Sequence, residues 1–319
     1  MQRLKRDDGV AGVFVAITIA TLLGMLGFAV DVGAMYDERR QLTNGADAAV
    51  LAIAEDCALK VSCNPGSAKK TAQSFANANA NDGAAFIESV VLDVSARTVR
   101  VDTGTLTPSG ERVFEPFFAQ VIGWDGATVY GSASALWGYP STMRGVLPLI
   151  ISQCEITPLK FDELRVLTFH DANKTEPCNA AVGMDGNDDG KLAAGFGWLI
   201  ADGADCSTAT LTISDWVFAD PGSSPSNGCS PPDISALIGE PTPLPIFDDL
   251  VGLGANGEYH IASFVLFEIA GYNFGGLYKF NPPCDGDERC VSGYFRTGTV
   301  HDGEPGGPNN GIVIVKLTG

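Results

Sequence analysis

Basic residues and histidine are scarce in this chain of 319 residues, which contains 20 Lys and Arg, 38 Asp and Glu, and 3 His. Residues 1–8 hold three of the basic and two of the acidic side chains, so residues 9–319 carry 17 basic and 36 acidic ones, a formal charge of −19. A surface this acidic repels nucleic acid and anionic lipid headgroups. The sequence therefore excludes a nucleic-acid partner, and it leaves solubility, divalent cations or cationic partners as uses of the charge.

The sequence motifs of common hydrolases and phosphate-binding enzymes are missing as well. There is no G-x-S-x-G, no H-E-x-x-H and no glycine-rich phosphate loop. His170 precedes Asp171 after a predicted strand, and His260 lies in the most apolar strand, where we expect a satisfied core histidine. The third histidine, His301, is distant from both in sequence. We therefore predict no catalytic residues and no cofactor.

Polar side chains are almost absent from residues 10–30, where only Thr18 and Thr21 interrupt the apolar run. At a rise of about 1.5 Å per residue, such a helix crosses a hydrocarbon core of about 30 Å, and it exceeds the apolar core of a signal peptide, about 7–15 residues. We predict a transmembrane helix over residues 9–30, with a cleaved signal peptide as the alternative. Three basic residues precede this helix: Arg3, Lys5 and Arg6. They predict that residues 1–8 lie in the cytoplasm and that the residues after the helix lie outside it.

Cysteine is absent before residue 57, and no Cys-x-x-Cys pair occurs in the chain, which disfavours a structural zinc site. Eight cysteines in an exported chain predict disulfides instead. Closure of short loops favours bonds between sequence neighbours. The resulting couples are Cys57 with Cys63, Cys154 with Cys178, Cys206 with Cys229, and Cys284 with Cys290.

Beyond the membrane segment, a pattern with spacings of three and four predicts that the helix continues to a stop at Asn64-Pro65-Gly66. A second helix, capped by Ser67, is expected to end near Gly83. Strands at 87–94 and 98–101, a short helix at 114–122 and a strand at 127–137 complete an α+β, pilin-like domain over residues 31–140. Its core is expected on one stripe of the long helix, formed by Leu42, Ala46, Ala49, Val50, Ile53 and Cys57.

Residues 145–319 have the sequence pattern of a mainly β, disulfide-containing domain, in which short strands are separated by turn-rich stretches at 221–228 and 241–243. The longest strand is apolar on both faces and should lie in the middle of a sheet. The predicted strands are 146–151, 164–169, 215–218, 259–270, 291–297 and 311–317.

One acidic motif in this domain suits calcium. Asp185, Asn187 and Asp189, followed by Gly190, match the first half of an EF-hand loop. The twelfth position is Phe196 instead of a bidentate Glu, which excludes a complete EF-hand. A looser calcium loop and an ordinary acidic turn stay as alternatives.

The segment from Gly24 to Ala49 resembles the N-terminal region of the TadE/TadG-like Flp pilus-assembly family. It contains V-D-V-G at 30–33, the aromatic residue Tyr36 and R-R-x-L-x-N-x-A-D-A-A at 39–49. Residues 117–123 and 128–135 are similar to the short helix and strand that follow in such proteins, and segments 245–248 and 259–264 show a looser likeness. The resemblance implies a single-pass, membrane-anchored component of the tight-adherence (Tad) pilus. Its expected partners are the membrane, the Tad pilus machinery or pilin subunits, and a second copy through the long helix.

Two departures from the family refine this expectation. Neither Gly9 nor Gly12 is followed by Glu at the fifth position, where processed pilins have one, so retention in the membrane is favoured over incorporation into a filament. The D-x-S-x-S metal motif of some TadG-type proteins is also missing. The leading hypothesis is a minor pilin-like assembly protein that acts through protein contacts. The alternatives are an anchored envelope hydrolase and a calcium-binding adhesin.

Overall fold

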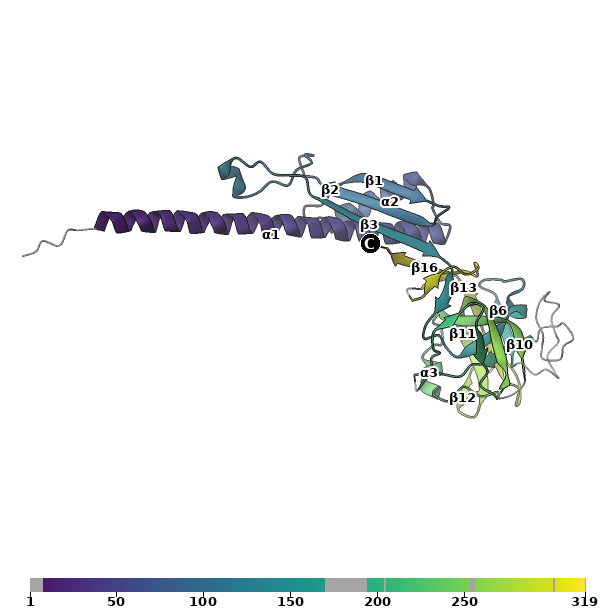
Figure 1. The fold of residues 1–319 in the computed structure, drawn as a ribbon. Helices are drawn as coiled ribbons and strands as arrows, with labels where there is room; N and C mark the ends of the chain where they lie inside the picture. Colours follow the sequence, from purple (N-terminus) through teal and green to yellow (C-terminus); the bar gives the residue numbers. More distant parts are fainter. Residues whose placement is uncertain (1–7, 170–193, 204, 253–255, 301, 319) are drawn as a thin grey trace, which may run out of the picture. The chain divides into compact units, whose positions relative to one another are not determined.

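The computed structural model describes residues 8–169, 194–203, 205–252, 256–300 and 302–318 (Figure 1). The chain divides into two compact units, one formed by the residues up to 136 together with the chain end from 316, and the other by residues 137–315. It passes from one unit to the other twice along the sequence. The fold class is α+β, with a long apolar helix followed mostly by β-strands, as the sequence predicted.

Helix α1 (Asp8–Ala58) has 51 residues and is the only helix among the described residues that is long and apolar enough to cross a membrane. Between residues 11 and 30 all residues are exposed except Gly27, which is buried. Figure 1 shows this half of α1 projecting from the rest of its unit. Gly33 and Gly45 do not interrupt the helix, in agreement with the prediction that it continues past the apolar run.

The outer half of α1 buries the predicted stripe. Its side chains are at most 7% exposed, and they are Leu42, Ala46, Ala49, Val50, Ile53 and Cys57. Helix α2 (Pro65–Asn79) packs on α1 through small residues, so that a Cβ added at Gly45 would lie 3.0 Å from Ala76 Cα. The cap of α2 differs from the prediction: Asn64 Oδ1 accepts a hydrogen bond from Ser67 N–H at 2.9 Å, and Ser67 lies inside the helix. Pro65 begins the helix because its missing N–H would be unbonded there anyway.

The sheet of this unit contains β1 (Ala85–Asp93), β2 (Thr98–Thr105) and β3 (Tyr130–Gly138), paired antiparallel in that order. Alternate residues of β2 and β3 are buried, and the first three of β3 are small, namely Gly131, Ala133 and Ala135. Gly131 permits the closest approach, since a Cβ there would lie 2.6 Å from Thr43 N. The long loop between β2 and β3 carries one 3-10 helix, η1 (Ala119–Ile122), which is shorter than the predicted helix at 114–122.

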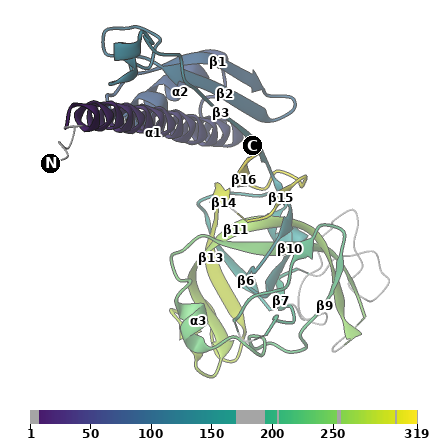
Figure 2. The same cartoon turned by 60° about the vertical axis from the view of Figure 1, so that its left-hand side comes forward.

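The second unit is mainly β, as predicted, and its largest sheet has the order β6-β13-β11-β10-β5-β7, with β9 and β12 also paired to β11 (Figures 1 and 2). Strand β11 (Glu258–Gly275) is the longest, is buried on both faces over much of its length and lies inside the sheet, in agreement with the prediction. A smaller sheet has the order β15-β4-β8, and β14 pairs parallel with β16. The remaining elements are β4 (Pro140–Met143), β5 (Leu149–Ser152), η2 (Gln153–Ile156), β6 (Leu164–Thr168), β7 (Phe196–Trp198), β8 (Leu211–Thr212), β9 (Trp216–Phe218), α3 (Pro231–Ser235), β10 (Thr242–Val251), β12 (Tyr278–Phe280), β13 (Cys290–Arg296), β14 (Gly298–Val300), β15 (Glu304–Pro305) and β16 (Ile312–Leu317).

Strand β10 contradicts the turn expected at residues 241–243. Pro243 and Pro245 lie within this strand, opposite Leu266 and Phe264 of β11. On the other side of β10, the pairing with β5 involves only Ile246 and Phe247. Proline lacks an N–H group for a second ladder, and this part of the strand does not require one.

Three disulfides join sequence neighbours: Cys57 with Cys63, Cys206 with Cys229, and Cys284 with Cys290. Cys154 is disulfide-bonded too, and its expected partner Cys178 lies outside the described residues. The first bond ties the end of α1 to the segment before α2. The other two fasten loops of the second unit, which has little helix to hold them.

Candidate functional site

The most distinctive polar contact of the first unit is at Asp31, directly after the apolar run of α1. This carboxylate is only 2% exposed. It accepts hydrogen bonds from the backbone N–H groups of Phe117 at 2.7 Å, Phe118 at 3.0 Å and Ala119 at 2.6 Å. Three amide donors compensate for the loss of water around the charge. Asp31 therefore connects α1 to the loop between β2 and β3.

The loop reaches Asp31 because it extends back along α1, as Figure 1 shows. The first N–H groups of a helical turn have no partner within the turn, so the start of η1 needs an external acceptor. Phe118 adds an apolar contact one turn earlier on α1, where a Cβ added at Gly27 would lie 2.9 Å from Phe118 Cβ and Cγ. Only glycine leaves room for this ring. Gly27 and Asp31 together fix the loop against one face of α1.

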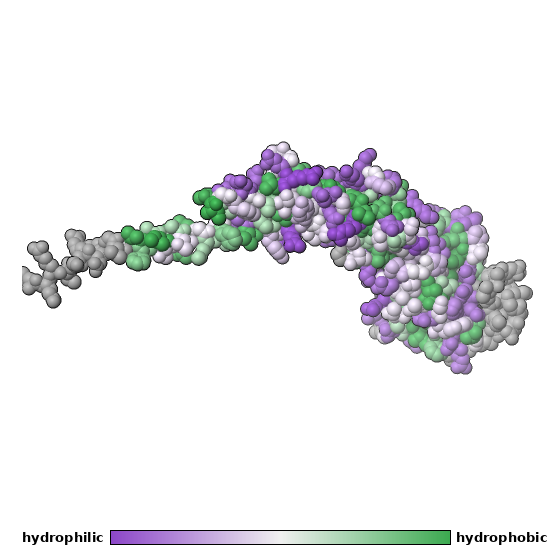
Figure 3. All heavy atoms as spheres, turned by 45° about the horizontal axis from the view of Figure 1, so that its top comes forward, coloured by the Kyte–Doolittle hydropathy of each residue, from purple (hydrophilic) through white to green (hydrophobic). Residues whose placement is uncertain are grey.

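The N-terminal half of α1 offers an apolar surface of a different kind. Its large side chains are 49–68% exposed, and they include Phe14, Ile17, Leu23, Met25 and Leu26. Figure 3 shows this apolar surface along the projecting helix. A contiguous surface of this size is unfavourable in water and is typical of contact with lipid or with another protein.

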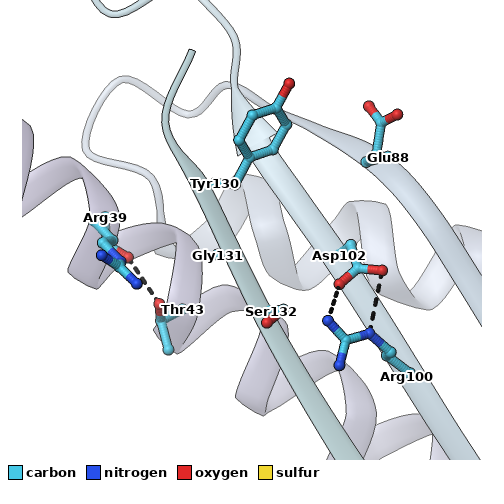
Figure 4. Close-up of a pocket in the computed structure, with 8 residues that line it drawn as sticks. All are labelled: Arg39, Thr43, Glu88, Arg100, Asp102, Tyr130, Gly131 and Ser132. Carbon is cyan, nitrogen blue, oxygen red and sulfur yellow. Dashed lines mark hydrogen bonds and ion pairs between the residues drawn. The ribbon is translucent and has the colours of Figure 1, made fainter. Parts of the chain in front are cut away.

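A polar depression lies beside the sheet of the same unit (Figure 4). Arg100 Nη2 is 2.7 Å from Asp102 Oδ1, and Ser89 donates to Asp102 Oδ2 at 2.6 Å. Partial burial raises the pKa of Asp102, but the hydrogen bonds from Ser89 and Arg100 outweigh it and hold this pKa below its usual range. Asp102 is therefore an ionised structural partner and is unsuited to act as a general acid. The lining residues are Arg39, Thr43, Glu88, Arg100, Asp102, Tyr130, Gly131 and Ser132.

In the second unit, His260 on β11 has a carboxylate partner. Its Nδ1 lies 2.5 Å from Asp248 Oδ1, both side chains are about one-quarter exposed, and the Trp216 ring is 5.1 Å away. The imidazole is thus satisfied, as expected, although it is less deeply buried than a core residue. A hydrolase triad would require a nucleophile and oxyanion donors in addition to such a pair.

The residues predicted to bind calcium, Asp185, Asn187 and Asp189, lie outside the described residues, as do His170 and His301. Within the part of the chain that the structure describes, no group of three or more His, Cys, Asp or Glu side chains could hold a metal ion. The role of Asp31 was not predicted from the sequence. The available signal was an acidic residue that borders an apolar run and lies two positions before a glycine, as in V-D-V-G.

These features define an α+β protein with one candidate membrane helix, which continues into the first unit and is followed by a mainly β unit. Residues 9–55 match the model of a family described as putative Flp pilus-assembly TadE/G-like. This match confirms the resemblance stated from the sequence. It covers the apolar half of α1, Gly27, Asp31 and most of the buried stripe. No significant match was found among curated proteins or solved structures.

Proposed function

We propose that this protein is a membrane-anchored, extracytoplasmic component of Tad/Flp-type pilus assembly, and that it acts through protein contacts instead of catalysis. The family match on α1 carries this proposal, because it coincides with a helix whose first half is exposed and apolar and whose second half is packed. A single-pass membrane anchor that carries two folded units accounts for both the exposed half and the packed half of α1. Lipid covers the first half, and the protein core covers the second.

The direction of insertion is part of the proposal. The basic residues before α1 favour a cytoplasmic N-terminus. Disulfides at Cys57–Cys63, Cys206–Cys229 and Cys284–Cys290 suit an oxidising compartment for everything beyond the helix. Both arguments support an extracytoplasmic location for the two units.

The proposed partners are pilin subunits or the Tad machinery. We expect them to contact the exposed face of α1 just after the apolar run. Tyr36 is 66% exposed and lies just beyond the apolar run, inside the matched segment. A photo-crosslinking residue at Tyr36 should capture a pilin or a machinery component in cells that assemble pili. The same residue at Leu277, which is 85% exposed in the second unit, is the comparison site.

The anchor itself is tested by an N-terminal epitope tag followed by carbonate extraction. We expect the tagged chain to remain with the membranes. Release of an untagged, soluble product would identify the apolar run as a cleaved signal. Normal piliation after deletion of the gene, combined with no crosslink at Tyr36, would contradict the role in pilus assembly.

A further inference from the structure

The tip of the loop between β2 and β3, residues 117–124, exposes an unusual number of apolar side chains. Val121 and Ile122 are 88% and 82% exposed, and Phe117 is 73% exposed. The tip has no charged side chain, and the nearest ones are Glu115 and Asp125 on either side. In a protein as acidic as this one, an uncharged apolar projection calls for a partner that removes it from water.

The position of this loop tip points to lipid. Phe118 contacts Gly27, which lies inside the apolar run of α1. Gly27 precedes Asp31 by four residues, so at about 1.5 Å per residue it is about 6 Å farther along the axis toward the N-terminus. The loop tip thus lies beside the last turns of the proposed membrane helix. Figure 3 shows apolar atoms of the loop next to the apolar surface of α1.

Most N–H groups of the loop tip have hydrogen-bond partners, which lowers the cost of contact with hydrocarbon, where unbonded polar groups are costly. Three N–H groups are taken by Asp31. Those of Val121, Gly123 and Trp124 donate to carbonyl groups of Phe118, Gln120 and Ala119. Trp124, at the end of the tip, is a residue that favours the membrane interface.

We propose that residues 117–124 insert into the extracytoplasmic leaflet beside α1 and form a second membrane contact of the first unit. The contact is apolar, because the acidic surface around it gives no attraction to anionic headgroups. A helix alone leaves the unit free to rotate about the helix axis and to shift in height. The loop tip restricts both motions and sets the side of α1 that faces other proteins. This inference rests on the proposed anchoring of α1.

The experiment uses the full chain, with its native disulfides, in phosphatidylcholine vesicles that contain lipid with a nitroxide near the headgroup end of the acyl chain. A bimane label is placed at one new cysteine, in the variants Val121→Cys, Val94→Cys and Ile17→Cys. Val94 is 56% exposed in the turn between β1 and β2, at the opposite end of these strands from the loop tip, and is the matched control. Ile17, inside the apolar run, reports on the anchor.

We expect the nitroxide lipid to quench bimane fluorescence at least twofold at Val121→Cys and to leave Val94→Cys unchanged, with quenching also present at Ile17→Cys. Quenching at position 17 but not at 121 would overturn the proposed insertion and leave the anchor intact. Absence of quenching at position 17 would overturn the anchor and the insertion together. A blue-shifted but unquenched label at 121 would show that protein, such as a second copy, covers the tip, and would also overturn the proposal.

Discussion

Replacing Asp31 by Ala should detach the loop between β2 and β3 from α1 while the rest of the unit stays folded. The substitution removes the acceptor of three backbone N–H groups. It leaves α1 itself intact, because Ala is a better helix former than Asp. The loop is then held mainly by the contact between Phe118 and Gly27.

The magnitude follows from the three hydrogen bonds. A hydrogen bond to a charged group contributes about 1.5–3 kcal/mol, and loss of a helix N-cap costs about 0.5–2 kcal/mol. Once the loop is released, the N–H groups of Phe117 and Phe118 can turn toward water, because both residues are more than half exposed, whereas Ala119 is 7% exposed. We therefore expect a loss of about 2–4 kcal/mol for docking of the loop, less than three full bonds.

Hydrogen exchange of the full chain in a lipid bilayer is the assay. A loss of 2–4 kcal/mol corresponds to exchange about 30- to 1,000-fold faster at the amides of residues 117–119. The amides of β2 and β3 should keep their protection. Asp31→Asn, which retains one carbonyl acceptor, should give an intermediate effect. Asp37→Ala is the matched control, since Asp37 is exposed on α1 and only accepts from Gln41 at 2.7 Å.

Two outcomes would refute this reasoning. Unchanged exchange at residues 117–119 in Asp31→Ala would mean that the carboxylate does not hold the loop. Equal loss of protection in β2 and β3 would mean that Asp31 supports the whole unit, and the loop could not be treated as a separately docked segment.

Three further predictions concern packing, pH and redox state. Ile53→Asp should cost several kcal/mol and unfold the first unit in proteolysis and calorimetry, because Ile53 is 1% exposed. Protease resistance equal to that of the wild type would contradict the packing of this stripe. Burial raises the pKa of Glu38, Asp82 and Asp37 add to the shift, and a hydrogen bond from Thr105 only partly opposes it. The contribution of the Glu38 carboxyl to stability is lost as pH rises through its folded-state pKa. Glu38→Gln should therefore raise Tm more at pH 7 than at pH 4. An equal gain at both pH values would contradict the raised pKa. Denatured, unreduced protein should take up no maleimide, because the described cysteines are disulfide-bonded, and labelled thiols would disprove the oxidised state.

The parts of the fold that depend on local pattern could be predicted from the sequence. The apolar run has the length of a membrane helix, and the stripe from Leu42 to Cys57 has the helical period, which together identified α1 as one continuous helix. The hairpin of β1 and β2 was found because Ser95-Ala96-Arg97 separates two β-branched runs. Strand β11 was placed inside its sheet because it is apolar on both faces.

Features that depend on distant partners were missed. Pro241 and Pro243 indicated a turn at 241–243, and only the limited pairing of β10 with β5 explains why a strand accepts Pro243. Asn64 took the capping role assigned to Ser67, because Pro65 starts α2 earlier than the serine would. Both errors arose where a residue has two common roles and the tertiary structure selects one.

Asp31 shows most clearly what sequence reasoning lacks. Taken alone, an Asp at the end of an apolar run is a charge expected to reach the headgroup region and water. In the structure it is buried, and the N–H groups it binds come from residues 86–88 positions later in the chain. The need is reciprocal, because the carboxylate requires donors and the start of η1 requires an acceptor where little water is present. One carboxylate of the family segment therefore holds a loop that lies outside that segment.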